Sequence, residues 1–246
     1  MQYHLDTIPV WEAMEQSTAC PLCALYRRVE ASEIERSLGG SVMEPDARIR
    51  VNEKGICARH HGQLFAMQNR LGHALLVDSH TKELLKKLER LEKRAASCEK
   101  RSLFGGGDGL EGVARELEDM CHTCVICGDI QSHMERYFYT FLHLWKTDAA
   151  FREKWQASRG VCLPHAADLL FRAQKHLSGS ARREFATSLL SLVKANLVQD
   201  EKDLEWFTLK FDYRNRQKPW GNSRDALERT VNRLRGFCVG GGETQE

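Results

Sequence analysis

Apolar residues recur with helical spacing along most of this chain. The clearest stretch is Thr81–Arg101, where Leu84, Leu88, Leu91 and Ala95 follow one another at intervals of four, three and four residues. Such intervals place the apolar side chains in one stripe along a helix, which then packs against a core. This segment therefore predicts a long amphipathic helix.

Start and stop signals predict further helices, with Pro in a first turn or Gly just beyond the last. The predicted helices are Pro9–Ser17, Leu22–Leu38, one from about Ala58, Glu111–Met120, Cys127–Trp145, Asp148–Ala157, Leu163–Leu177, Ser180–Lys210 and one beginning at Ser223. The only strand candidate is the short run Arg48–Val51. The pattern therefore predicts an all-α protein.

Glycine clusters divide the chain. Residues 103–112 contain five glycines and are expected to form a linker, and Gly240–Gly242 opens a polar tail. We expect a first unit at 1–102, the linker at 103–112, a second unit at 113–210, and a C-terminal arm, helix and flexible tail at 211–246.

The near-neutral charge balance does not indicate a polyanionic partner, and the apolar segments bear on the compartment. The 246 residues carry a net charge of +2, and 42% of them are hydrophobic. The longest aliphatic runs are too short to span a bilayer, and the opening residues lack the basic and apolar regions of a signal peptide. We therefore expect a cytoplasmic protein without a membrane span.

Six of the nine cysteines and two of the ten histidines form two matching sets. Both sets read C-x2-C and later G-[IV]-C-x2-H, with 33 or 34 residues between the second and third cysteines. The first set is Cys20, Cys23, Cys57 and His60, and the second is Cys124, Cys127, Cys162 and His165. Two such matched sets indicate an internal duplication.

The spacings are typical of zinc ligands. Two cysteines separated by two residues can bind one ion through a tight turn, and Cys and His three apart in a first helical turn share a face. Three thiolates and one imidazole complete a tetrahedral, structural zinc site. The sequence therefore predicts two zinc ions, with each half of the chain supplying all four ligands of its own site.

Alternatives remain at this stage. Cys121 extends the second set to C-x2-C-x2-C, which also suits an iron–sulfur cluster. His61 competes with His60, although the match to His165 favours His60. Cys98 and Cys238 fit no ligand spacing and are expected to be buried or idle thiols.

No enzyme class is supported, because the sequence contains none of the metalloprotease, nucleophile-elbow or Walker motifs. The leading hypothesis is a non-catalytic binding or adaptor protein with a protein partner. The first alternative is an iron–sulfur or thiol-based redox protein. The second is nucleic-acid binding through the Lys82–Arg101 face and the Tyr213–Arg224 arm, whose basic and aromatic residues could contact phosphates and bases.

Three segments carry a family resemblance: YHLDTIPVWEAMEQSTACPLCALYRRVE, GGSVMEPDARIRVNEKGICARHHGQLFAMQNRLG and KFDYRNRQKPWGNSRDALER. Together they resemble an uncharacterised bacterial family of cytosolic proteins, known as a domain of unknown function. The resemblance extends over nearly the whole chain. It implies that both cysteine–histidine sets belong to the family pattern, and it brings no established activity.

Overall fold

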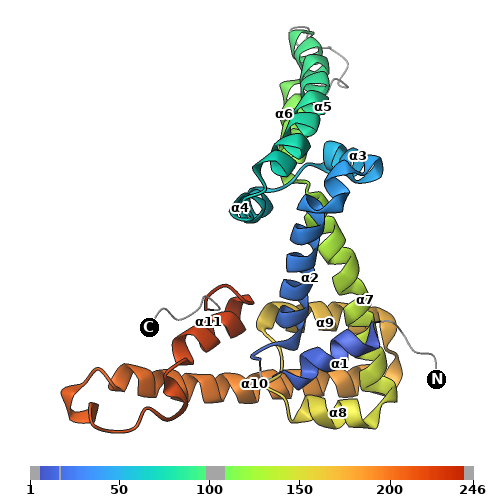
Figure 1. Cartoon of the computed structure of the whole chain (residues 1–246). Coiled ribbons are helices and arrows are strands. Elements are labelled where there is room, and N and C mark those ends of the chain that lie inside the picture. Colours follow the sequence, from blue (N-terminus) through green and yellow to red (C-terminus); the bar gives the residue numbers. More distant parts are fainter. Residues whose placement is uncertain (1–5, 17, 98–108, 241–246) are drawn as a thin grey trace. The chain divides into compact units, whose positions relative to one another are not determined.

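The computed structural model describes residues 6–16, 18–97 and 109–240. These residues form an all-α fold without strands (Figure 1). The α-helices are α1 (Thr7–Glu15), α2 (Pro21–Leu38), α3 (Pro45–Lys54), α4 (Ala58–Ala66), α5 (Arg70–Ala96), α6 (Gly109–His122), α7 (Val125–Thr147), α8 (Ala149–Gln156), α9 (Leu163–His176), α10 (Gly179–Leu209) and α11 (Ala226–Arg235). The short 3-10 helices are η1 (Gly40–Met43), η2 (Tyr213–Asn215) and η3 (Gly221–Ser223). None of the described helices has the length and apolar character that crossing a membrane requires.

Two local expectations were wrong. The strand candidate Arg48–Val51 lies inside α3, which begins with Pro45 in its first turn and ends at Lys54, with Gly55 as its C-cap. Pro at that position is pre-organised for a helix, and the buried Val51 packs as a helical side chain. Ser223 belongs to η3, and the last helix begins three residues later at Ala226.

The chain forms two compact units, and these differ from the expected halves. Unit 1 comprises Met1–Arg28 and His133–Glu246, and unit 2 comprises Val29–Ser132. The chain passes from one unit to the other inside the continuous helices α2 and α7. Most of the predicted linker, 103–112, lies outside the described residues, and its last four residues begin α6.

Unit 1 has an aromatic core. Phe141 of α7 makes edge contacts with Phe151 and Trp155 of α8 at centroid distances of 5.1 and 5.2 Å. Trp145 packs on Phe185 of α10 at 5.0 Å. All five rings are almost completely buried, and aromatic burial of this kind dominates core energetics.

A buried ionic network fastens α11 to α10 within unit 1. Asp200 of α10 accepts hydrogen bonds from Arg229 Nε at 2.9 Å and from Arg233. Arg229 also pairs with Asp203 at 2.7 Å, and Arg233 Nη1 donates to the Arg159 carbonyl at 2.7 Å. These partners satisfy the charges that burial would otherwise leave without solvation.

Unit 2 places α3 and α4 against the first part of α5 and the start of α7. Its apolar core includes Val42, Val51, Leu64, Leu76 and Ile126, each at most 6% exposed. Asp129 of α7 pairs with Arg36 of α2 at 3.2 Å and with Arg50 of α3. The last turn of α2 therefore lies beside the first turns of α7.

Candidate metal centres

Four ligand atoms meet in unit 1, here called the Cys20 site. The site consists of Cys20, Cys23, Cys162 and His165, whose ligand atoms all lie within 4.8 Å of one another. His165 Nδ1 is 3.4 Å from the sulfurs of both Cys20 and Cys23, and 3.2 Å from Cys162 Sγ. Cys23 Sγ is 3.6 Å from Cys162 Sγ. This group could hold a metal ion.

A second group meets in unit 2, here called the Cys57 site. It consists of Cys57, His60, Cys124 and Cys127, again within 4.8 Å of one another. His60 Nδ1 lies 3.3 Å from Cys57 Sγ, 3.4 Å from Cys124 Sγ and 3.5 Å from Cys127 Sγ. Cys57 and Cys127 have their sulfurs 3.9 Å apart. This group could also hold a metal ion.

The structure brings together all eight sequence-predicted ligands, but it exchanges the expected partners. The C-x2-C of the first half meets the C-x2-H of the second half, and the reverse holds at the other site. The backbone supports the exchange independently of sulfur, since Val125 N donates to the Gly55 carbonyl at 3.0 Å. The Thr123 hydroxyl also donates to the Lys54 carbonyl, at 2.7 Å. The expectation that each half closes its own site was therefore wrong.

The length of α2 gives a physical reason for the exchange. At 1.5 Å per residue, the 18 residues of α2, which directly follow Cys20, form a helix about 27 Å long. The chain leaves α2 beside the start of α7, where Arg36 pairs with Asp129. The next C-x2-H, at Cys57, consequently meets the cysteines that precede and begin α7.

The two C-x2-H turns have the same local geometry. Gly55 and Gly160, each two residues before the cysteine, have φ of 66° and 68°. Residues that carry a side chain rarely adopt this left-handed backbone conformation, so glycine is required there. Cys57 and Cys162 then cap helices α4 and α9, with ψ of 163° and 160°. Each histidine follows in the first turn, on the same face as its cysteine.

The electrostatics of the thiols favour a cation. Burial raises the pKa of Cys20. Burial and the nearby Cys124 raise the pKa of Cys127 to about 12. Burial opposes ionisation of Cys124, but its hydrogen bonds, led by the one with His60, lower its pKa to about 6. Burial likewise opposes protonation of His165, yet Cys162 and Cys23 raise its pKa to about 10. A divalent cation would relieve the repulsion that keeps neighbouring thiols from ionising together.

Glu30 contacts the His60 ring of the Cys57 site on the side away from the sulfurs. His60 is fully buried, and its Nε2 lies 3.2 Å from Glu30 Oε1. Arg59 donates to the same carboxylate at 2.7 Å. Because Nδ1 faces the sulfurs, Nε2 carries the hydrogen and donates it to Glu30, which fixes the ring. No sequence signal identified Glu30, since it lies 30 residues from His60 in a helix of mixed charge.

The Cys20 site has a different environment. The His165 ring packs beside Phe138 of α7, with centroids 5.9 Å apart. The Arg172 guanidinium lies 4.2 Å from the centroid of the same phenyl ring. Cys20 and Cys162 are buried, whereas Cys127 of the other site is exposed and Cys57 is half-buried. The Cys57 site is therefore the more accessible of the two.

We expect Glu30→Gln to weaken metal binding at the Cys57 site selectively. The amide keeps the size of the side chain but loses the charge that accepts the His60 hydrogen, and such losses lower metal affinity by about 10- to 100-fold. Competition with a chromophoric chelator, followed through two separate dissociation steps, measures this. The matched control is Glu33→Gln on the same helix, which should leave both steps unchanged. Equal affinities in the Glu30 variant and the wild type would contradict the role.

Other candidate ligands lie outside both groups. Cys121 is exposed and is not part of the Cys57 site, and Cys238 is exposed rather than buried. His61 Nδ1 meets His73 Nε2 at 2.8 Å, and His60 is the histidine that lies in the Cys57 site, as the match to His165 indicates. Cys98 lies outside the described residues.

The two basic segments also form contacts within the chain. On α5, Lys82 pairs with Asp78, and Lys86 pairs with Glu83, both at 2.6 Å. In the Tyr213–Arg224 arm, Arg214 pairs with Asp212 at 2.6 Å, and Tyr213 is 85% exposed. Lys210 fixes this arm by donating to the carbonyls of Asn215, Arg216 and Lys218 at 2.6–3.0 Å. Arg101, the end of the first segment, lies outside the described residues.

The fold and the two groups define a class: an all-α protein with two cysteine–histidine sets able to hold metal ions. A family model matches residues 1–240, and the chain belongs to that family, the family of unknown function DUF6062. No curated protein and no solved structure matches the chain.

Proposed function

We propose that this protein is a non-catalytic, zinc-stabilised binding or adaptor protein of the cytoplasm. Two zinc ions hold its helices in place, and the helical surface binds a protein partner. The observation that carries the proposal is the pair of four-donor groups. Four protein ligands complete a tetrahedral zinc site and leave no position for substrate or catalytic water, which is the pattern of structural zinc.

The distances within each group support one ion in each. Zinc–sulfur bonds of about 2.3 Å and zinc–nitrogen bonds of about 2.0–2.1 Å give tetrahedral edges of about 3.8 Å between sulfurs and about 3.6 Å between sulfur and nitrogen. The sulfurs of Cys23 and Cys162 lie 3.6 Å apart and those of Cys57 and Cys127 lie 3.9 Å apart, and the sulfur–nitrogen distances run from 3.2 to 3.5 Å. An iron–sulfur cluster would spread its four ligands farther, because they would be divided among two or more irons. The eight described cysteines are free thiols, as a reducing compartment maintains.

Metal analysis tests the proposal. Protein purified without oxygen should contain two zinc ions per chain and be colourless, since zinc has no partly filled d shell. Iron with visible absorbance would refute the zinc assignment. A folded protein that contains neither metal would refute the structural role.

Thiol-based redox sensing is a second candidate, favoured by one observation. Cys127 is exposed and Cys57 is half-buried, so an oxidant can reach the Cys57 site. Hydrogen peroxide would take two electrons from two thiolates, giving a disulfide and two hydroxide ions and releasing the metal. Peroxide titration should then release one ion before the other. Simultaneous release of both ions would count against this candidate.

A further inference from the structure

An apolar groove runs between the second half of α5 and helix α6 in unit 2. Its volume is about 410 Å³. It is lined by Leu85, Leu88, Glu89, Leu91, Glu92, Ala95, Val113 and Leu117. Leu85, Leu88 and Leu117 are 54%, 43% and 41% exposed, although all three side chains are apolar. The two helices therefore leave much of their shared apolar surface open.

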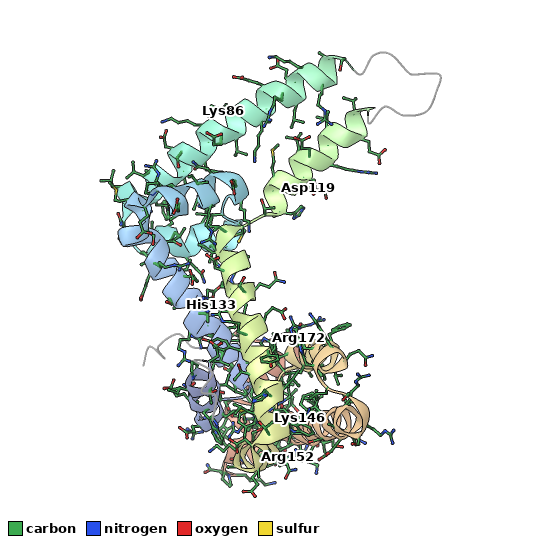
Figure 2. All side chains as sticks on the ribbon, turned by 90° about the vertical axis from the view of Figure 1, so that its right-hand side faces the viewer. Lys86, Asp119, His133, Lys146, Arg152 and Arg172 are labelled. Atoms are coloured by element: carbon green, nitrogen blue, oxygen red, sulfur yellow. The ribbon has the colours of Figure 1, made fainter. Side chains whose placement is uncertain are left out.

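Two helices alone do not cover this apolar surface, and a third helix is needed to bury it. Figure 2 shows the two helices, with Lys86 marking α5 and Asp119 marking α6. An ion pair between Arg94 and Glu116 joins them on another side. Among the described residues that line the groove, all come from these two helices. A third amphipathic helix would bury the leucines, as in helix-in-groove recognition.

The charged residues that line the groove indicate which kind of partner it binds. Its only charged lining residues are Glu89 and Glu92, and no ion pair within the described parts of the chain engages them. Helix α6, which forms the other wall, contributes only apolar residues to the lining, and two of its four acidic residues pair with Arg115 and Arg94. The basic residues of α5 do not line the groove. A second copy of this groove would bring Glu89 and Glu92 against the same two glutamates, whereas a basic helix complements them.

We propose that this groove binds a cationic amphipathic helix of a protein partner. The inference rests on the proposed binding function and names the partner class. The lining of α5 extends over eleven residues, from Leu85 to Ala95, which corresponds to about 15 Å, or about three helical turns. The partner helix presents apolar residues at positions i, i+3 or i+4, and i+7, with Lys or Arg on both flanks.

The test uses the metal-loaded full chain and a fluorescent helical peptide of about 14 residues, with leucine at these positions and lysine elsewhere. A second peptide carries glutamate in place of lysine. Fluorescence anisotropy should show binding of the lysine peptide only. The double variant Leu85→Gln, Leu117→Gln should weaken binding by about tenfold or more, because both side chains lose apolar contacts. Glu89→Lys with Glu92→Lys should reverse the charge preference.

Leu190→Gln on α10 is the matched control, because Leu190 is 54% exposed, as is Leu85, in a separate apolar groove. It should leave affinity unchanged. Absence of binding, equal binding of both peptides, equal loss in the control, or a chain dimer that depends on Leu85 and Leu117 would each overturn the proposal. If protein with two bound metal ions and full helical signal fails to bind, the groove assignment fails alone. Folded protein without metal would instead refute the proposed function.

Discussion

Stripping both metal ions from this protein is expected to unfold at least one of its two compact units. Structural zinc contributes about 10–16 kcal/mol of apparent free energy in small peptides, and a typical domain has a net stability of only about 5–15 kcal/mol. Without the ion, the thiols and imidazole of each site lose the interaction that holds two distant chain segments together. Far-ultraviolet circular dichroism during titration with a strong chelator should show a cooperative loss of helical signal.

The control for this experiment is the same chelator premixed with excess zinc, which should preserve the signal. Adding zinc after stripping should restore it if unfolding is reversible. A melting temperature that stays unchanged in protein shown to contain no metal would contradict a structural role for either site.

The second large effect is expected for Cys162→Ser. Cys162 is completely buried in the Cys20 site, so the variant loses a thiolate that solvent cannot replace. We expect it to bind one ion instead of two and to lose most of the stability of unit 1. Elemental analysis and thermal melting measure both effects. Cys238→Ser is the matched control, because Cys238 is exposed, lies in the same unit and belongs to neither site. It should retain two ions and the wild-type melting temperature.

The helices could be predicted from the sequence because their apolar spacing, prolines and glycines act locally. The expected Leu22–Leu38 helix differs from α2 by one residue at its start, and the expected Leu163–Leu177 helix differs from α9 by one residue at its end. The strand candidate failed because alternation over only four residues, Arg48–Val51, is too short to exclude a helix. Helix α5 begins at Arg70, well before the expected Thr81, because Asn69 caps it by accepting a hydrogen bond from Gly72 N at 3.0 Å.

The eight residues that meet in the two groups could also be predicted, but their pairing could not. Both sets have the same C-x2-C and C-x2-H spacings, so each pair of cysteines is chemically suited to either C-x2-H. The choice depends on where α2 ends relative to α7, and on contacts such as Val125 N with the Gly55 carbonyl. These contacts join residues far apart in the chain, and local patterns carry no information about them. The roles of Glu30 and Phe138 depend on the same tertiary arrangement.

Thiol mapping in the Cys162→Ser variant tests the exchanged pairing most directly. The folded variant is treated briefly with an alkylating reagent, and each cysteine is scored by peptide mass spectrometry. The account predicts that Cys20 and Cys23 gain reactivity, while Cys124 and Cys127 remain as protected as in the wild type. If Cys124 and Cys127 gain reactivity and Cys20 and Cys23 stay protected, each half closes its own site and the account is contradicted.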